Sequence, residues 1–498
     1  MKTHISFIYN GKDVAIDFRK TPFKPSTTVL NWIRLYEGQK DVKEGCAEGD
    51  CGACTVVVAE TSGDGKSLRY KAVNSCLLFL PALDGKMLIT AAGISPLNHD
   101  AEKLHPVQKA IVDSHATQCG FCTPGFVMSL FALYHKIGKH SVDEINNALA
   151  GNLCRCTGYD SIRKATLEAM KGKRADHYSS NEKILAAQLK KIQPEDNLLA
   201  ENHGQLYIRP VSLKELFALR KKYPFSIIVN GSTDVALKQS KHFETLPAVL
   251  DISGITDIKY LKTNKTGLEF GSGVCLEDLR LAAEKTFPQM HSLLSVFASR
   301  QIRNMATVGG NLGSSSPIGD TLPLLIACDA EIIALSPKGK RTIPSADFIT
   351  GYRKNALKKD EIIFGVNLPV PAKNELVEFY KVSKRHDMDI STVSGAFRLI
   401  LKKDGTVDLI NLVFGGMADR TKKAEKTMAF LTGKKWNEEN VKKAMKILEK
   451  EFTPLSDARS GAEFRNSAAA NLLMKFHVRT CLCMSSALCM SDLNNPKK

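Results

Sequence analysis

The cysteines constrain this chain more than any other feature, because eight of its 13 lie before Thr157. Cys46, Cys51, Cys54 and Cys76 have the spacing C-x₄-C-x₂-C…C, which is typical of plant-type [2Fe–2S] ligation. Three interleaved glycines suit a loop that wraps closely around inorganic sulfur, since glycine allows positive φ. The pattern predicts an iron–sulfur site; a structural zinc site or reduced free thiols are the alternatives.

A second set consists of two short cysteine pairs at predicted helix boundaries. Cys119 and Cys122 lie in QCGFCTPG, and Cys154 and Cys156 lie in GNLCRCTGY. Taken alone, this set fits tetrahedral zinc about as well as iron. Beside a ferredoxin-type loop on the same chain, a second electron carrier is the better interpretation.

Length and composition limit the number of domains and the class of protein. At 498 residues the chain predicts three or four compact units, and its 43% hydrophobic and 24% charged residues are typical of soluble globular protein. The formal charge of +17 is scattered, which favours a phosphate-bearing cofactor or an acidic partner subunit over nucleic acid. Met1–Asn10 has no apolar signal core, and the apolar stretch Leu322–Leu335 contains Asp329 and Glu331. We therefore expect a cytoplasmic protein with no membrane contact, whose cysteines bind metal rather than form disulfides.

Hydrophobic periodicity predicts an N-terminal sheet followed by a four-helix bundle. The sheet comprises a hairpin at His4–Phe18, strands at Thr55–Glu60, Arg69–Val73 and Met87–Thr90, and a helix at Thr28–Glu37. The bundle comprises helices at His105–His115, Gly125–Ile137, Val142–Ala150 and Ser161–Lys171. A polar linker with some helix follows at Gly172–Gly204. Near the C-terminus we expect strands at Gly395–Leu401 and Asp408–Phe414, and helices at Lys422–Leu431 and Glu438–Lys450.

Two glycine-containing segments are candidates for phosphate contacts. Ser226–Val235, SIIVNGSTDV, is an apolar strand that runs into a tight turn, although taken alone an ordinary strand and turn is the better interpretation. Arg300–Ala327 contains Gly309-Gly310-Asn311 and Asp320, whose carboxylate could hold a ribose hydroxyl; a glycine-rich surface loop is the alternative. No G-x-G-x-x-G follows a strand, so a Rossmann dinucleotide site is not supported.

A ferredoxin-like domain followed by QCGFCTPG and GNLCRCTGY closely resembles the molybdenum hydroxylase family. The resemblance runs from about residue 3 to about residue 478, and the order of clusters then flavin is that of the small subunit of two-subunit xanthine dehydrogenases. It implies two [2Fe–2S] clusters, with the bundle cluster nearer the molybdopterin of a partner chain and the ferredoxin-like cluster nearer FAD. Gln118 matches the family position that approaches the pterin.

The resemblance also implies a vanillyl-alcohol-oxidase-type FAD domain. The FAD contacts it predicts are Ile228, Val229, Asn230, Gly231, Ser232, Thr233, Asp234, Val235, Phe297, Thr307, Gly310, Asn311, Asp320, Ile363 and Lys381. Phe379–Ser391 resembles the loop beside the flavin where NAD is admitted. Lys384 and Arg385 could meet cofactor phosphates there, although an ordinary basic turn would look the same.

Together these observations predict an α+β multidomain protein. Its expected parts are a β-grasp ferredoxin-like domain (1–94), a helical [2Fe–2S] bundle (95–172), a linker (173–203), an FAD-binding domain (204–372), a C-terminal α+β flavoprotein subdomain (375–480) and a tail (481–498). Cys481, Cys483 and Cys489 are expected to be spare thiols in a frayed terminus.

The resemblance implies an electron-transfer subunit. It would carry electrons from a large molybdopterin-binding partner through two clusters to FAD and on to NAD, in hypoxanthine and xanthine oxidation. We expect a dimer of heterodimers and no catalytic acid or base for hydroxylation in this chain. The alternatives are the same role for another N-heterocycle or aldehyde hydroxylase, an electron-transfer adaptor that does not bind NAD, and oxygen as the acceptor.

Overall fold

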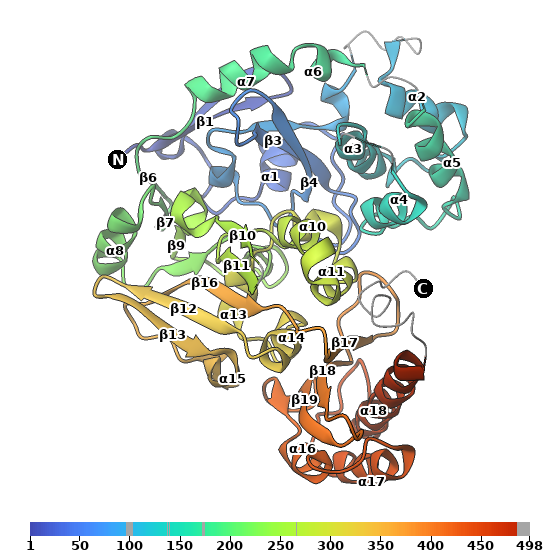
Figure 1. Ribbon diagram of the computed structural model, residues 1–498. Helices are drawn as coiled ribbons and strands as arrows, with labels where there is room; N and C mark the ends of the chain where they lie inside the picture. Colours follow the sequence, from blue (N-terminus) through green and yellow to red (C-terminus); the bar gives the residue numbers. More distant parts are fainter. Residues whose placement is uncertain (96–102, 137, 139, 172–174, 265, 486–498) are drawn as a thin grey trace. The chain divides into compact units, whose positions relative to one another are not determined.

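The computed structural model describes residues 1–95, 103–136, 138, 140–171, 175–264 and 266–485 (Figure 1). The chain divides into two compact units. The first comprises Met1–Thr256 with Ser299–Ala306, and the second comprises Asp257–Ala298 with Thr307–Lys498. Among the described residues, no helix combines the length and apolar content needed to cross a bilayer.

The first unit begins with a five-stranded sheet in the order β2-β1-β5-β3-β4. Its strands are β1 (His4–Tyr9), β2 (Lys12–Asp17), β3 (Thr55–Thr61), β4 (Leu68–Asn74) and β5 (Met87–Ile89). Asn10 and Gly11 both have positive φ, 47° and 81°, as a two-residue hairpin turn requires. The predicted helix is present as α1 (Val29–Asn31), which continues into a π-helical turn, η2 (Trp32–Tyr36). Trp32 packs edge-on against Phe7 and Tyr9, and this fixes the helix on the sheet.

The four predicted bundle helices are all present. They are α2 (Pro106–Asp113), α3 (Thr123–Tyr134), α4 (Val142–Leu149) and α5 (Asp160–Ala169). Ser141 caps α4 by accepting from the Glu144 N–H, and α3 is buried along almost its whole length. The predicted linker contains α6 (His177–Ser180) and α7 (Glu182–Lys191), and α7 packs into the core that α3 shares with the sheet. The two cysteine pairs therefore lie at the ends of fixed helices.

A second sheet completes the first unit, in the order β6-β7-β9-β8. Its elements are β6 (Leu198–Asn202), β7 (Gln205–Arg209), β8 (Ile227–Val229), β9 (Ala248–Asp251), α8 (Leu213–Lys222) and α9 (Val235–Ser240). The short helix α12 (Arg300–Arg303) belongs to this unit although it is distant in sequence.

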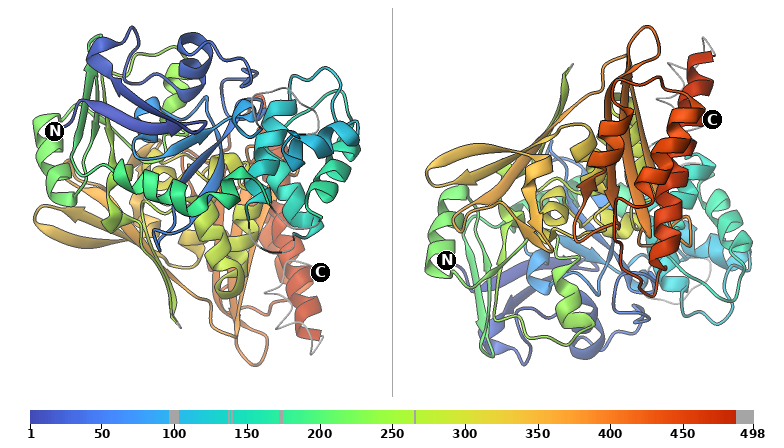
Figure 2. Two further views of the ribbon diagram at one scale, coloured as in Figure 1. Left: turned by 90° about the horizontal axis from the view of Figure 1, so that it is seen from above. Right: turned by 90° about the horizontal axis from the view of Figure 1, so that it is seen from below.

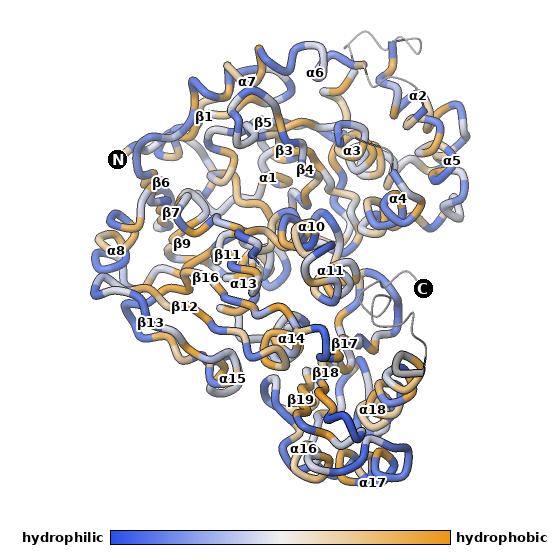
Figure 3. The backbone as a smooth tube through the Cα atoms, in the orientation of Figure 1, coloured by the Kyte–Doolittle hydropathy of each residue, from blue (hydrophilic) through white to orange (hydrophobic). Residues whose placement is uncertain are grey.

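The second unit contains an antiparallel sheet in the order β10-β11-β16-β12-β13. The strands are β10 (Leu261–Thr263), β11 (Gly267–Gly271), β12 (Glu331–Ser336), β13 (Gly339–Pro344) and β16 (Ile362–Pro369), with a small pair β14 (Ile349–Gly351) and β15 (Lys354–Asn355). The helices are α10 (Leu276–Thr286), α11 (Pro288–Ser295), α13 (Val308–Ser314), α14 (Thr321–Ala327) and α15 (Ser345–Phe348). Every residue of α14 is buried, and Figure 3 shows it largely in the hydrophobic colour.

The second unit ends in an α+β layer that was mostly predicted. It contains β17 (Glu375–Val382), β18 (Val393–Leu401), β19 (Val407–Gly415), β20 (Lys422–Lys423), α16 (Glu425–Leu431), α17 (Glu438–Leu448) and α18 (Ala462–Ser485). The helix predicted from Lys422 begins at Glu425, because the two lysines instead pair with β19 as an edge strand. The long helix α18 lies along the sheet (Figure 2).

The expectation that Cys481 lies in a frayed terminus is wrong. Cys481 belongs to α18, is partly buried, and lies 3.7 Å from the His477 ring nitrogens. Cys483 is also in this helix, whereas Cys489 lies outside the described residues.

Candidate cofactor sites

The first cysteine set forms two close sulfur pairs. The Cys51 thiol donates to Cys46, and the Cys54 and Cys76 sulfurs are 3.3 Å apart. These residues come from the loop before β3 and from the end of β4, so the sheet fixes both sides of the site. Two pairs of thiols suit two metal ions with two thiolates each, as in a [2Fe–2S] cluster, better than a single tetrahedral ion.

The loop around Cys46 favours an anionic sulfur. The hydrogen bond from the Cys51 thiol, followed by backbone N–H groups, lowers the pKa of Cys46 to about 5. The Glu48 and Cys51 N–H groups each lie 3.4 Å from its sulfur. N–H groups directed at sulfur are what an anionic iron–sulfur group requires.

The second set pairs its cysteines across the two motifs. The Cys119 and Cys156 sulfurs are 3.7 Å apart, and Cys122 lies beside Cys154. Burial, with the hydrogen bond to Cys154, raises the pKa of Cys122 to about 12. The pairing again gives two thiols for each of two metal ions, so the residues fit a second [2Fe–2S] group. Cys119 and Cys156 are exposed, as is Gln118.

The predicted strand and turn at Ser226–Val235 is present as β8 followed by a tight turn into α9. Gly231 and Ser232 have φ of 90° and 60°. A side chain at Gly231 would collide with the Met305 carbonyl, so only glycine fits this approach. The Ser232 hydroxyl donates to the Leu77 carbonyl at 2.7 Å, one residue after Cys76. The turn therefore lies directly beside the first cysteine set.

In the second unit, the predicted FAD residues gather at α13 and α14. Thr307 caps α13 by accepting from the Gly310 N–H at 3.1 Å, and the Asn311 side chain accepts from Thr321 at 2.5 Å. Ile363 contacts this helix beside Gly313.

Asp320 and Lys381 form a buried ion pair at 2.9 Å. Lys381 also donates to the Val296 carbonyl, next to Phe297, and Ser391 donates to the other Asp320 oxygen at 2.6 Å. Both Asp320 oxygens are thus engaged by protein donors. Ser391 was not among the predicted contacts, because a lone serine at a strand end carries no distinguishing sequence signal.

The loop predicted to admit NAD turns between β17 and β18. Arg385 donates to the Met388 carbonyl at 2.6 Å, and Asp389 accepts from the Arg385 N–H. Lys384 reaches the Ala458 carbonyl at 3.2 Å. Both basic side chains are exposed, so they remain accessible to a phosphate.

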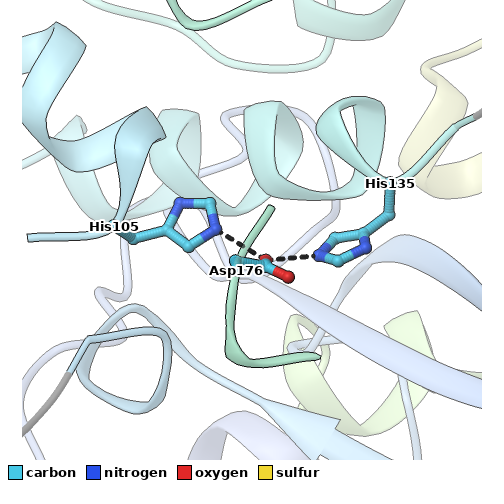
Figure 4. A group of neighbouring side chains, drawn as sticks. All are labelled: His105, His135 and Asp176. Carbon is cyan, nitrogen blue, oxygen red and sulfur yellow. Dashed lines mark hydrogen bonds and ion pairs between the residues drawn. The ribbon is translucent and has the colours of Figure 1, made fainter. Parts of the chain in front are cut away.

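His105, His135 and Asp176 form a third polar cluster, separate from the two cysteine sets (Figure 4). Both histidine Nε2 atoms lie within hydrogen-bond distance of one Asp176 oxygen, at 2.8 and 2.9 Å. His105 Nδ1 accepts from the Val107 N–H, so Nε2 carries the ring proton and donates it to Asp176. Asp176 also caps the start of α6, so the cluster joins this helix to His105 and His135.

Three protein-family models match the chain in order. They are the [2Fe-2S] binding domain (residues 90–167), the FAD binding domain in molybdopterin dehydrogenase (200–371) and the CO dehydrogenase flavoprotein C-terminal domain (378–480). The chain belongs to the molybdenum hydroxylase family, as an iron–sulfur and flavin protein.

Within this family, the domains are those of the small [2Fe–2S]/FAD subunit, and the relatives in sequence are xanthine dehydrogenases. The chain is 32% identical to xanthine dehydrogenase of Emericella nidulans over 95% of its own length and 38% of the relative's. It is 30% identical to xanthine dehydrogenase/oxidase of Gallus gallus over 95% of its length and 40% of the relative's. The chain thus spans about two fifths of the length of these relatives and corresponds to their N-terminal part.

Solved structures share the fold at lower identity. Cu,Mo-CO dehydrogenase matches with a TM-score of 0.50 and 23% identity, over 54% of this chain and 94% of that one. Quinoline 2-oxidoreductase from Pseudomonas putida 86 matches with a TM-score of 0.51 and 21% identity, over 55% of this chain and 96% of that one.

Proposed function

We propose that this chain carries electrons from a molybdopterin-bearing partner through two [2Fe–2S] clusters to FAD and on to NAD, in the oxidation of hypoxanthine and xanthine. The observation that carries the proposal is the adjacency within the first unit. The flavin-type turn at Ser232 is hydrogen-bonded to Leu77, which follows the cluster cysteine Cys76. Electron carriers must lie close together, and the turn and the cysteine loop are in direct contact here.

Each cysteine set is the proposed ligand set of one cluster. The first cluster takes Cys46, Cys51, Cys54 and Cys76, and the second takes Cys119, Cys122, Cys154 and Cys156. When bound, the clusters pass single electrons and FAD collects two of them for hydride transfer. The chain's own residues hold these groups in place and supply N–H donors to the sulfurs.

The second cysteine set faces the proposed partner. Cys119 and Cys156 are exposed, and the apolar side chains of Phe121 and Tyr159 beside them are 48% and 43% exposed. An exposed sulfur set with apolar neighbours suits coverage by a docked protein, because aromatic side chains are enriched in interface cores. The proposed partner is the large molybdopterin-binding subunit.

The predicted FAD residues divide between the turn at β8 and the segments from Thr307, Asp320 and Lys381. The exposed Lys384 and Arg385 support an NAD phosphate contact. An adaptor that passes electrons to another carrier is the competing assignment for this loop.

Metal and flavin analysis of anaerobically purified protein tests the proposal first. Four irons, four acid-labile sulfides and one FAD per chain are expected, with two distinct [2Fe–2S] EPR signals after dithionite reduction. Zinc instead of iron, or a chain that does not bind flavin, would refute it. NADH-driven dye reduction by the flavin-loaded chain is expected as well; its absence would favour the adaptor.

A further inference from the structure

The loops that carry the two cysteine sets meet through one backbone hydrogen bond. The Leu153 N–H donates to the Cys51 carbonyl at 3.0 Å. Leu153 directly precedes Cys154, so this bond joins a residue of the first set to the neighbour of a residue of the second. The sulfurs of Cys154 and Cys51 are thereby connected through covalent bonds of the chain and one hydrogen bond.

Three buried polar side chains, those of Asn152, Ser129 and Gln301, form a hydrogen-bond network at the point where the two loops meet. The Asn152 side chain donates to the Gly52 carbonyl at 3.0 Å, next to Cys51. Its own amide oxygen accepts from Ser129 at 2.6 Å and from Gln301 at 2.8 Å, and Gln301 also donates to Ser129 at 2.9 Å. All three side chains are at most 2% exposed. The Asn152 amide is thus hydrogen-bonded through both its nitrogen and its oxygen, as most buried amides are.

Around this hydrogen-bond network, the backbones of the two cysteine loops and of α3 approach each other so closely that only glycine fits between them. Gly52 has a φ of 67°, and a side chain there would collide with the Gly151 carbonyl and with Asn152. A side chain at Gly125, in α3, would collide with the Gly52 carbonyl. The loops thus pack with no room for a side chain between them, and the hydrogen bond from Asn152 to Gly52 joins them at this spacing.

From this geometry we propose that Asn152 is a positioning residue for electron transfer between the two cysteine sets, held in place by Ser129 and Gln301. The inference rests on the proposed function and goes beyond it, because it assigns the transfer between clusters to a specific junction. One electron leaves one iron–sulfur group and enters the other; no covalent bond forms or breaks and no proton moves. Asn152 contacts no sulfur itself and acts through the Gly52 carbonyl and the Leu153 N–H beside it.

The test compares the full chain with its variants N152A, Q301M and S129A. All are expected to retain four irons per chain and two [2Fe–2S] signals. In N152A, the rate of electron transfer between the clusters after flash photoreduction should fall by about tenfold, the effect typical of outer-shell partners of metal ligands. The magnetic splitting between the two reduced clusters should shrink in parallel, a readout that a purely structural role would not move. Q301M and S129A each remove one of the two donors to Asn152 and should give intermediate values.

Q289M is the matched control. Gln289 is also a buried amide, 9% exposed, and donates to a backbone carbonyl within the second unit, which contains neither cysteine set. Its transfer rate and splitting should equal those of the unmodified chain.

The outcomes are distinguishable. Two intact signals with unchanged transfer rate and splitting in N152A would overturn the inference alone. An unmodified chain without two [2Fe–2S] signals would overturn the proposed function and this inference with it. If N152A fails to fold, Q301M and S129A decide, since each leaves Asn152 one donor; unchanged rates in both would overturn the inference.

Discussion

The turn at Gly231 allows the flavin proposal to be tested by a single methyl group. Gly231 has a φ of 90°, and an added Cβ would overlap the Met305 carbonyl oxygen. The substitution G231A therefore imposes two separate costs. The left-handed backbone costs alanine about 1–2 kcal/mol, and overpacking against a fixed backbone atom adds about 1–3 kcal/mol.

Gly204 supplies the matched control, because it separates the two costs. It lies in the hairpin between β6 and β7 of the same unit, has a φ of 70°, and has no atom within 4 Å of an added Cβ. G204A should therefore carry the backbone strain without the collision. The difference between the variants isolates about 2 kcal/mol that arises from the Met305 contact.

That difference appears in FAD affinity if the turn holds the flavin. The turn can relieve the overlap only by moving away from Met305, which displaces the N–H groups proposed to contact FAD. A loss of about 2 kcal/mol corresponds to a roughly thirtyfold weaker Kd. Titration of the deflavinated protein, followed by quenching of flavin fluorescence, measures it, with iron content as the check on folding. Equal FAD affinity in G231A and G204A would refute the placement of the flavin at this turn.

Three further predictions address stability and metal content. Burial raises the pKa of Asp176, but the histidine hydrogen bonds outweigh it and hold this pKa well below its usual range. The stability that the Asp176 carboxylate contributes is therefore fully present above the unfolded pKa near 4 and is lost as the pH falls. In urea denaturation, D176N should lower the free energy of unfolding by about 2 kcal/mol at pH 7 and by progressively less below pH 4. D320A should lower the free energy of unfolding by about 3–5 kcal/mol, because it leaves the buried Lys381 ammonium without its carboxylate. The control D419A removes the half-exposed partner of Lys422 and should cost less than about 1 kcal/mol when both variants are measured by thermal unfolding. C119S should remove one EPR signal and about half of the iron while the other signal persists, and loss of both signals would contradict two independent sites.

Local signals explain why the cysteine-bearing part could be predicted so fully. Ser141 before α4 and Pro106 at the start of α2 are strong helix-start signals, and each is followed by an apolar period that matches a buried face. The cysteine spacing then placed each motif at a helix end or a loop. The sequence spacing of the cysteines does not show which sulfurs pair, and the structure does. Cys119 and Cys156 come together only because α3 and α4 pack against each other.

The missed features have non-local causes. The edge strand at Lys422–Lys423 forms because its backbone pairs with β19. Two consecutive lysines do not predict a strand by themselves. Helix α18, which the structure describes over Ala462–Ser485, was also not predicted from the sequence. Its stability comes from Leu473 and Phe476, which pack into the core of the C-terminal layer.

The segment Arg300–Ala327 shows most directly how tertiary contacts divide a stretch of sequence that looks continuous. It looks like one glycine-rich element, yet the structure divides it after Ala306. Gln301 is fully buried against the loop of the second cysteine set, and Ile302 contacts the loop of the first, beside Gly49. Thr307 then begins the helix that carries the predicted FAD residues. Within the first unit, α12 therefore contacts both cysteine loops, at positions far from it in sequence. Its polar residues Gln301 and Arg303 make their hydrogen bonds with distant positions of the chain, which no local pattern records.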